Sequence, residues 1–378
     1  MKVMCVVGAR PNFMKAAPVI EALQATPGFH VSLIHTGQHY DRKMSTLFFE
    51  ELGMPKPDLD LQVGSGSHGE QTGQIMIRFE PVLKQEQPDL VVVFGDVNST
   101  VATALCAAKL GIKVAHVEAG LRSFDRTMPE ELNRIVTDHL SDYLFITEPS
   151  GHDNLVREGI PETKMFFVGN VMADTLLKHR ERARGLAARE RLGLAAQAYG
   201  ILTLHRPSNV DVPETLDGIL EAVSEIANEL PIVFPCHPRT RQHLNESLIK
   251  LNDPKGMKDH RVMITDSLGY LEFLSLMIDA RLVLTDSGGI QEETTVLGIP
   301  CLTLRDNTER PVTVEQGTNV LVGTSRERIL ATAEKVLNEE NPRGHVPALW
   351  DGKAAKRIAE IVACPEKNNT PLVFADMR

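Results

Sequence analysis

The chain has 378 residues, and 42% of them are hydrophobic, a length and composition that favour two domains with separate cores. A formal net charge of −10 argues against a nucleic-acid surface, because a protein that neutralises many phosphates is usually basic. No stretch is apolar for as long as a membrane helix requires, and the five scattered cysteines contain no CxxC pair, so we expect a cytoplasmic protein with reduced cysteines and neither a nucleic-acid nor a membrane partner.

In the first half of the chain, short apolar runs rich in valine alternate with stretches of helical periodicity. This alternation is typical of β-α-β units, which build a parallel sheet covered by helices on both faces. The predicted strands are residues 2–7, 31–35, 90–94, 113–117, 143–147 and 166–168.

A second series of strands follows a polar stretch with helical character at residues 176–192. Its predicted strands are residues 200–204, 231–234, 262–264, 281–285, 300–304 and 319–322. We therefore predict an α/β protein with two Rossmann-like, doubly wound domains, residues 1–172 and 173–352. Residues 353–378 are expected to return to the first domain as a C-terminal helix and tail, with Asp351 as the predicted cap of that helix. Ligands of such sheets bind beyond the carboxyl ends of the strands, so two such domains facing each other predict a cleft that holds the active site.

Charged side chains follow the predicted strands of the first domain. Arg10 and Lys15 lie after the first strand, near the start of a helix, where two cations would suit an anion. Asp96 and Glu118 each follow a buried, valine-rich strand, and partly desolvated carboxylates of this kind acquire pKa values useful for proton transfer. Glu130 lies in the predicted first turn of a helix, where compensation of the helix dipole is the simpler interpretation.

The second domain has a comparable arrangement. His205 and Arg206 follow its first strand, and Ser287, Gly288 and Gly289 follow its fourth. Two glycines at a strand-to-helix junction let a ligand approach the backbone, and the N–H groups at a helix start suit a diphosphate.

Two further features support a nucleotide there. Glu293 lies about one turn into the same helix, where it either accepts hydrogen bonds from ribose hydroxyls or is another first-turn acid. Arg305 and Arg310 lie in the loop after the fifth strand, where they either serve the nucleotide or pair with surface acids.

Three other patterns do not support a function. Residues 64–69 match GxGxxG, but a half-acidic segment precedes them, and we interpret them as a flexible loop. None of the four tyrosines has a lysine four positions later, the spacing of the acid/base pair in NAD-type redox epimerases, so redox chemistry of that kind is not expected. Asp58 with Asp60, and His35 with His39, have the spacing of metal ligands but lack a third ligand nearby, so we predict neither a metal nor a cofactor.

Over nearly its whole length the chain resembles the non-hydrolysing bacterial UDP-N-acetylglucosamine 2-epimerases. The matching motifs, in family order, are GARP from Gly8 with Lys15, TGQH from Thr36, Gly95-Asp96, HVEAGLR from His116, PEE from Pro129 with Arg134, His205-Arg206, SGG from Ser287 with Glu293, and TERP from Thr308. The resemblance implies a glycosyltransferase-B architecture, a homodimer, and two domains that close on a UDP-sugar.

The reaction that the resemblance implies is reversible inversion at C2 of UDP-N-acetylglucosamine, which gives UDP-N-acetylmannosamine. UDP is eliminated across C1–C2 to leave 2-acetamidoglucal and is then added back with the opposite C2 configuration. Asp96, Glu118 and Glu130 are the implied acid/base groups, His205 assists the diphosphate or a proton transfer, and which carboxylate is the base stays open. The implied substrate-binding residues are Arg10, Lys15, Arg134, Arg206, His237, Phe273 beside the uracil, Ser287, Gly288, Gly289, Glu293 and Arg310.

The sequence departs from the family pattern at several positions. Ala9 and Asn12 replace Thr and Glu in the first loop, Pro207 follows the His-Arg pair, and Glu70 precedes Gln71 where an Arg-Gln pair is usual. In many bacterial members that arginine helps bind a second, activating UDP-N-acetylglucosamine, whose diphosphate an acid would repel. We therefore expect this enzyme not to require the activator.

Fold alone does not fix function, so other classes stay open. A hydrolysing epimerase would release N-acetylmannosamine and UDP, and a glycosyltransferase-B type transferase would pass the sugar to an acceptor. A binding protein that senses UDP-sugars would need no cluster of carboxylates around the ring. A further modified UDP-hexosamine as the true substrate also stays open.

Overall fold

The computed structural model describes residues 1–38, 48–236, 240–241, 243–244, 262–338 and 344–364. The chain forms two compact units, each with a parallel sheet of its own. The first unit contains Met1–Lys178 together with the described residues from Ala348 onward, and the second contains His179–Pro347. The boundary falls inside helix α7, Val171–Arg184.

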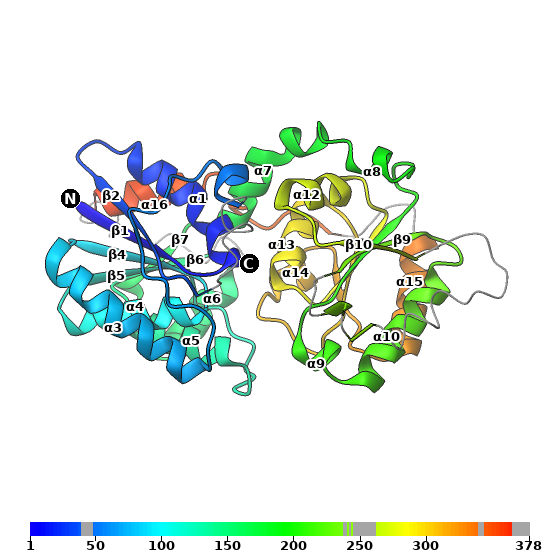
Figure 1. Cartoon of the computed structure of the whole chain (residues 1–378), viewed down its shortest axis with the longest axis horizontal. Helices are drawn as coiled ribbons and strands as arrows, with labels where there is room; N and C mark the ends of the chain where they lie inside the picture. The colour runs from blue at the N-terminus through cyan, green and yellow to red at the C-terminus, as the bar shows by residue number, and fades with distance from the viewer. Residues whose placement is uncertain (39–47, 237–239, 242, 245–261, 339–343, 365–378) are drawn as a thin grey trace. The chain divides into compact units, whose positions relative to one another are not determined.

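The sheet of the first unit has seven strands in the order β3-β2-β1-β4-β5-β6-β7 (Figure 1). The strands are β1 Lys2–Val7, β2 His30–His35, β3 Leu59–Asp60, β4 Leu90–Phe94, β5 Lys113–Ala119, β6 Tyr143–Ile146 and β7 Met165–Phe167. Every residue of β4 is buried, as expected for a central parallel strand covered on both faces. The apolar pattern does not predict β3, because both residues of this short edge strand are exposed.

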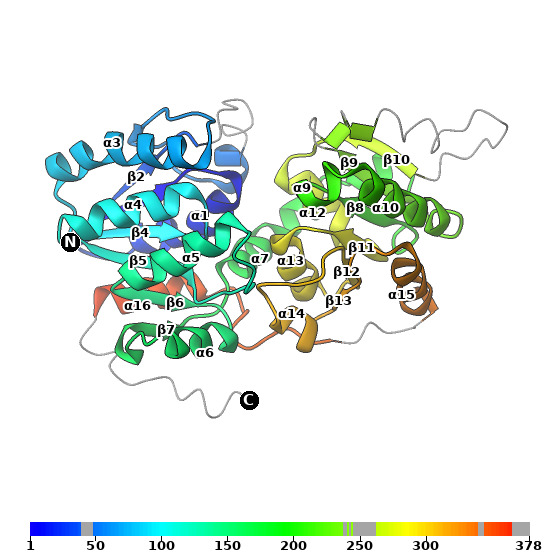
Figure 2. The same cartoon turned by 90° about the horizontal axis from the view of Figure 1, so that it is seen from below.

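Helices cover both faces of this sheet. They are α1 Arg10–Gln24, α3 His68–Glu86, α4 Asn98–Lys109, α5 Pro129–Leu140, α6 Pro149–Arg157, α7 and α16 Ala354–Ala363, with a 3₁₀ turn at Glu162–Lys164. Helices α1 and α16 pack together on one face, while α3, α4 and α5 lie side by side on the other (Figures 1 and 2). The GxGxxG-like segment is a loop only as far as Ser67, which caps the start of α3.

The C-terminal helix α16 is fastened to the first unit. The Asp174 carboxylate accepts hydrogen bonds from the N–H groups of Ala354 and Ala355, at 3.1 and 2.7 Å, at the start of this helix. The buried Trp350 donates its Nε1–H to the Thr147 carbonyl at 2.9 Å. The expectation that Asp351 caps the helix is wrong, because its carboxylate instead accepts from the Lys353 N–H and pairs with Arg357.

The second unit has a six-stranded parallel sheet in the order β10-β9-β8-β11-β12-β13. The strands are β8 Gly200–Thr203, β9 Ile232–Cys236, β10 Val262–Asp266, β11 Leu282–Thr285, β12 Cys301–Thr303 and β13 Asn319–Leu321. The helices are α8 Ala188–Arg191, α9 Pro207–Val210, α10 Pro213–Ile226, α12 Tyr270–Ile278, α13 Gly288–Leu297, α14 Val312–Glu315 and α15 Arg326–Asn338.

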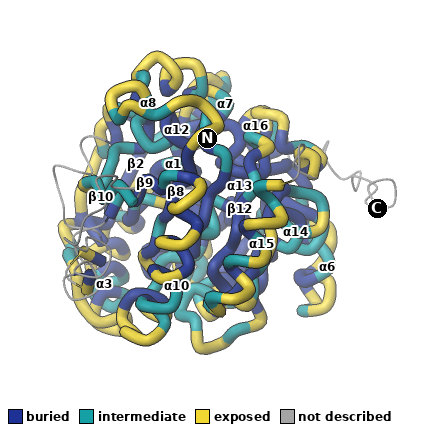
Figure 3. Tube along the Cα trace, turned by 90° about the vertical axis from the view of Figure 1, so that its right-hand side faces the viewer, coloured by how far each residue is buried: buried dark blue, intermediate teal, exposed yellow. Residues whose placement is uncertain are grey.

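The core of the second unit lies between its sheet and helices α10 and α15, which contribute Ile219, Val223 and Ile329 among others. The central strands are buried, whereas the outer faces of these helices are exposed (Figure 3). The predicted α/β class with two doubly wound parallel sheets is confirmed, and the predicted strand ends agree with the structure within two residues. The polar stretch at residues 176–192 is not one helix, because α7 ends at Arg184 and α8 begins only after Ala187, whose φ is +49°.

Candidate active site

The loop after β1 is fixed by Asn12. Its Oδ1 accepts hydrogen bonds from the N–H groups of Gly8 and Ala9, at 3.2 and 3.3 Å, and its Nδ2 donates to the Phe94 carbonyl at 2.8 Å. Asn12 therefore ties the carboxyl end of β1 to that of β4, the position where strand order reverses and where ligands bind in doubly wound sheets. Gly8 has no room for a side chain, since a Cβ would lie 2.0 Å from Ser99 Oγ.

Lys15 and Glu118 form a buried ion pair at this switch point. Lys15 Nζ lies 2.6 Å from Glu118 Oε1, and the side chains are 6% and 1% exposed. A Cβ at Gly95, the residue before Asp96, would lie 2.8 Å from Lys15 Nζ and 3.8 Å from Glu118 Oε1. The structure thus brings the end of β4 next to the ion pair, and it places Lys15 against a carboxylate.

The backbone at Glu118 adopts an unusual conformation. Its φ is +76°, a value that side-chain-bearing residues rarely adopt, and the pairing of β5 with β6 shifts register between Val117 and Ala119. Strained residues of this kind persist only where the surrounding structure holds them, and they cluster at functional sites. The bulge supports a functional role for this carboxylate.

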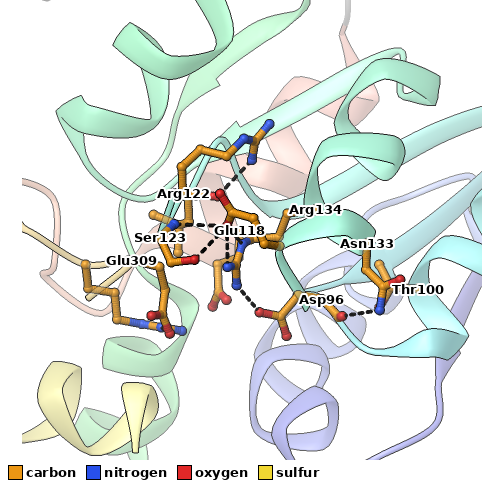
Figure 4. A network of polar contacts seen from close by, with 12 residues as sticks. Asp96, Thr100, Glu118, Arg122, Ser123, Asn133, Arg134 and Glu309 are labelled. Carbon is orange, nitrogen blue, oxygen red and sulfur yellow. Dashed lines mark hydrogen bonds and ion pairs between the residues drawn. The ribbon is translucent and has the colours of Figure 1, made fainter. Parts of the chain in front are cut away.

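Asp96 is held by α5 (Figure 4). Arg134 Nη1 lies 2.5 Å from Asp96 Oδ2, and Asn133 Nδ2 donates to the Asp96 carbonyl at 2.8 Å. The Asp96 side chain is 19% exposed and that of Arg134 only 2%, so the carboxylate faces partly outward from a buried cation. The resemblance implies that Arg134 binds substrate, whereas the structure pairs it with a predicted catalytic acid.

Glu130 and Glu131, neighbours at the start of α5, have different surroundings. Glu131 is buried and accepts hydrogen bonds from the N–H groups of Ser123 and Phe124, both at 2.9 Å, while pairing with Arg134 at 2.6 Å. Burial would raise the pKa of Glu131, but these donors outweigh burial and lower it. Glu130 is half-buried, and its carboxylate forms no hydrogen bond within the described parts of the chain. Glu131 therefore shapes the loop, while Glu130 keeps its carboxylate available.

The contacts of Arg10 are with residues other than these carboxylates. Its guanidinium stacks over the Phe48 ring, 4.4 Å from the centroid, and burial lowers its pKa against the opposing effect of Glu51.

In the second unit, Asp286 organises the loop after β8. It is fully buried and accepts hydrogen bonds from the N–H groups of His205 and Arg206, at 3.1 and 3.0 Å, and from Asn209 Nδ2 at 3.2 Å. Its Oδ1 lies 2.7 Å from Nδ1 of His205, whose side chain is 57% exposed. Burial would raise the pKa of Asp286, but the contacts with His205 and the backbone donors lower it. Asp286 thus orients an accessible imidazole, a role that the sequence analysis did not assign to it.

At the start of α13, Gly288 has no room for a side chain. A Cβ at Gly288 would lie 2.3 Å from Arg310 Nη1 and 2.8 Å from Glu309 Oε1. Ser287, Gly288 and Gly289 are each only partly buried, so the free N–H groups of this helix start lie near the surface beside a guanidinium.

Three arginines share two buried carboxylates next to this helix start. Glu309 contacts Arg310 and Arg305, with 2.8 Å to Arg305 Nη2, and lies 3.9 Å from Arg206 Nη2. Arg310 Nε also lies 2.9 Å from Glu292. Arginine pairing with acids, one of the two expected alternatives, is therefore observed, although the acids are buried and not on the surface.

Glu293 lies deeper in the same helix and is 4% exposed. Burial raises its pKa to about 8, with Glu292 adding to the increase and a hydrogen bond with Tyr270 opposing it. Three guanidinium groups, those of Arg206, Arg305 and Arg310, lie together beside the start of α13, an arrangement suited to an anion.

Of the remaining predicted site residues, Phe273 is half-buried on α12, and His237 lies outside the described residues. The Asp58–Asp60 pattern has a structural explanation, because Asp58 accepts from the Leu33 N–H and Asp60 from the Gln62 N–H. His35 faces Asp60 at 3.5 Å, and His39 is not among the described residues. Within the described ranges, His, Cys, Asp and Glu side chains form no group of three or more that could hold a metal. None of the helices described is long and apolar enough to cross a membrane.

The chain matches the family model described as UDP-N-acetylglucosamine 2-epimerase over residues 21–363. It is 47% identical to the UDP-N-acetylglucosamine 2-epimerase of Methanocaldococcus jannaschii over 371 residues, which are 96% of this chain and 99% of that protein. It is also 44% identical to the UDP-2,3-diacetamido-2,3-dideoxy-D-glucuronate 2-epimerase of Pseudomonas aeruginosa, with 96% of this chain and 99% of that protein covered.

Solved structures give the same result. The crystal structure of the M. jannaschii epimerase in complex with UDP-GlcNAc and UDP superposes with a TM-score of 0.86, covering 96% of this chain and 99% of that one. The Neisseria meningitidis UDP-GlcNAc 2-epimerase bound to UDP-GlcNAc, 33% identical, superposes with a TM-score of 0.84, covering 96% of this chain and all of that one.

Proposed function

Because the chain belongs to the UDP-N-acetylglucosamine 2-epimerase family, we propose that it reversibly converts UDP-N-acetylglucosamine to UDP-N-acetylmannosamine. One observation carries the proposal for this chain: Asp96 and Glu118, at the ends of neighbouring strands, each contact a cation. Such a contact holds each carboxylate in place at a strand end, where it can accept or deliver a proton.

The reaction we propose is an elimination followed by an addition. A carboxylate removes the C2 proton while the C1–O bond breaks, and UDP departs with the bonding electrons to leave 2-acetamidoglucal. A second group then delivers a proton to the opposite face of C2 as a UDP oxygen attacks C1. Inversion therefore needs acid/base groups on both faces of the ring, which favours a site with more than one carboxylate.

We assign this proton transfer to Asp96, Glu118 and Glu130. The positive φ of Glu118 and the partial exposure of Asp96 support their roles. Glu130 is included because its carboxylate, unlike that of Glu131, is not engaged in holding the loop. Lys15 and Arg134 are assigned as the cations that keep these acids in place.

The second unit is proposed to hold the UDP portion. The guanidinium groups of Arg206, Arg305 and Arg310 suit a diphosphate, as do the N–H groups at the start of α13. We assign to the accessible His205 ring, oriented by Asp286, a hydrogen bond to the departing phosphate. We retain Glu293 beside the ribose, Phe273 beside the uracil, and Arg10 and His237 as substrate contacts to be tested.

A proton NMR assay in deuterium oxide tests this function. UDP-N-acetylglucosamine should gain UDP-N-acetylmannosamine signals while the C2 proton of both sugars exchanges for deuterium. Absence of C2 exchange, with transfer of the sugar to an added acceptor, would identify a transferase. Accumulation of free N-acetylmannosamine and UDP would identify a hydrolysing epimerase.

The sugar itself is tested separately. The Pseudomonas aeruginosa relative carries the name of an enzyme for a diacetamido glucuronate, at an identity close to that of the archaeal relative. Parallel assays with UDP-N-acetylglucosamine and with UDP-2,3-diacetamido-2,3-dideoxy-D-glucuronate compare kcat/KM directly. We expect kcat/KM to be higher for UDP-N-acetylglucosamine.

We further propose a cytoplasmic homodimer. Four of the five cysteines are buried, and all are free in the structure, which suits a reducing compartment. Ile77 on α3 is 65% exposed, and Leu132 and Val136 on α5 are 41% and 42% exposed, on the helical face of the first unit that also carries α4. Light scattering should give twice the chain mass, and Ile77→Glu with Val136→Lys should give a monomer.

A further inference from the structure

His116 is a buried side chain that the proposed reaction leaves unused. It lies on β5, two residues before Glu118, and is fully buried. Its Nε2 lies 2.8 Å from the Gly95 carbonyl oxygen, and its Nδ1 lies 2.6 Å from Oδ1 of Asp138 on α5. Both ring nitrogens therefore have partners on other elements.

The two partners of the ring are both acceptors. A backbone carbonyl can only accept a hydrogen bond, and so can an ionised carboxylate, so the ring of His116 is held between two acceptors on other elements. Burial would raise the pKa of Asp138, but His116 and Arg122 outweigh burial and lower it, in agreement with an ion pair.

Asp138 extends the pair to the loop after β5. Its Oδ2 accepts a hydrogen bond from the Gly120 N–H at 3.1 Å and lies 2.7 Å from Arg122 Nη2. Arg122 is itself held by Glu158, with contacts of 2.8 Å from Nε and Nη2. We call His116, Asp138, Arg122 and Glu158 the His116 cluster. It contacts Gly95, next to Asp96, and Gly120, two residues beyond Glu118.

The backbone that the cluster contacts has positive φ angles, which residues with side chains rarely adopt. The φ angles of Gly95, Glu118 and Gly120 are +60°, +76° and +82°. A Cβ at Gly120 would lie 2.4 Å from the Gly151 carbonyl oxygen, so this turn is also tightly enclosed. Such conformations need contacts that hold them, and hydrogen bonds from an ion pair are stronger than those from neutral groups.

Helix α5 carries both Asp138 of this cluster and Arg134, which forms the ion pair with Asp96. Arg134 and Asp138 are four residues apart, so their side chains extend from the same face of the helix. Arg134 holds the Asp96 carboxylate, while Asp138 holds the neighbouring backbone through His116. One rigid element thus sets the position of both strand ends.

We propose that His116 and Asp138 form a positioning pair that aligns Asp96 and Glu118 for proton transfer at C2. The pair acts through Gly95 and Gly120 and does not itself touch the sugar. This inference rests on the proposed roles of the two carboxylates. The alternative is that the pair is a buried ion pair that contributes only to stability.

Asp138→Asn is the decisive variant, with His116→Asn as a second. The amide has the size of the carboxylate but removes the negative charge and one acceptor. We expect kcat to fall about 100-fold in both variants, as is typical for misplacement of reacting groups by about 1 Å, while the Kd of UDP changes less than about twofold. The matched control is Glu158→Gln, which changes the outer contact of Arg122 but leaves the contacts of His116 and Asp138 with Gly95 and Gly120 in place, and its kcat should match that of the parent.

Fluorescence of Trp350, the single tryptophan, separates positioning from stability because this side chain is buried in the first unit. If kcat per natively fluorescing molecule is unchanged in Asp138→Asn and His116→Asn, or if neither variant folds, the pair only stabilises and the proposal is wrong. Asp96→Asn and Glu118→Gln are measured alongside. If those two retain full kcat, the assignment of the acid/base groups fails; if they lose it while Asp138→Asn does not, only the positioning pair fails.

Discussion

At the scale of single residues, the acids of this protein differ mainly in what surrounds them. Glu118 faces a lysine, Glu131 accepts backbone N–H groups and pairs with an arginine, and Glu293 lies beside a tyrosine and another glutamate. For Glu131 and Glu293 the direction of the pKa follows these contacts: donors lower the pKa of Glu131, whereas burial raises that of Glu293 to about 8. Glu131 and Glu293 both lie near the start of a helix, so position along the chain does not distinguish them, and their different surroundings could not be predicted from the sequence.

Glu293 should make stability depend on pH. Its pKa is about 8 in the folded protein against 4.5 for the ordinary carboxyl group, so between these values the folded state binds more protons than the unfolded state. The free energy of unfolding from this group is therefore highest below pH 4.5 and falls as the pH rises towards 8. Urea unfolding without nucleotide should show that Glu293→Gln gains stability relative to the parent across this window. A difference that stays constant with pH would show that Glu293 is already ionised in the folded protein.

Gly288 should be required for nucleotide binding because Arg310 occupies the space of its missing side chain. In Gly288→Ala the new methyl would lie 2.3 Å from Arg310 Nη1 and displace the guanidinium from Glu309. We expect the Kd of UDP, measured by calorimetry, to rise about tenfold, or about 1.4 kcal/mol. Gly218→Ala on α10 is the control, since nothing lies within 4 Å of its added Cβ, and it should leave UDP binding unchanged.

At the scale of helices and strands, hydrophobic periodicity predicted those elements that are built from buried apolar runs. Valine-rich β4 has every residue buried, and its limits agree with the prediction. The exposed strand β3 has no apolar run, and the break after α7 depends on a positive φ at Ala187 that an alanine does not signal. The cap of α16 was wrongly assigned because Asp174, which provides it, is 180 residues away in the chain.

Asp174→Ala should weaken the attachment of α16. The substitution removes both hydrogen bonds to the first N–H groups of this helix, at a cost of about 1–2 kcal/mol typical for lost caps. The Trp350 fluorescence transition in urea should shift to lower denaturant accordingly. Ser67→Ala, which removes the long 3.4 Å cap contact at the exposed start of α3, should shift it less. Equal shifts would indicate that Asp174 contributes no more than a surface cap.

At the scale of the whole molecule, both units use the same layout. In each, strand order reverses at the first strand, and buried side chains tie the ends of the strands on either side of the reversal, Asn12 in the first unit and Asp286 in the second. The alternation of strands and helices along the chain predicted that functional polar side chains would lie at these strand ends. The pairing of Lys15 with Glu118 could not be predicted, because it joins residues 103 positions apart.

The expected independence from an activating second substrate also concerns the whole molecule. Glu70 is exposed in the first turn of α3, whereas its neighbour Gln71 is buried, with Nε2 donating to the Gly64 carbonyl at 2.9 Å. An exposed acid at this position would repel a second diphosphate. Pure UDP-N-acetylmannosamine should therefore be converted without a lag, as followed by NMR. A lag that added UDP-N-acetylglucosamine abolishes would contradict this, and Glu70→Arg should then shorten it.

The attachment of α16 has a consequence for biosynthesis. The second unit, His179–Pro347, is continuous in sequence, whereas the first is interrupted by it and gains Trp350 and α16 only after the second has been translated. On the ribosome, the second unit is therefore fully synthesised before the first can bury α16. A nascent chain stalled after Pro347 leaves open the α1 surface that α16 covers.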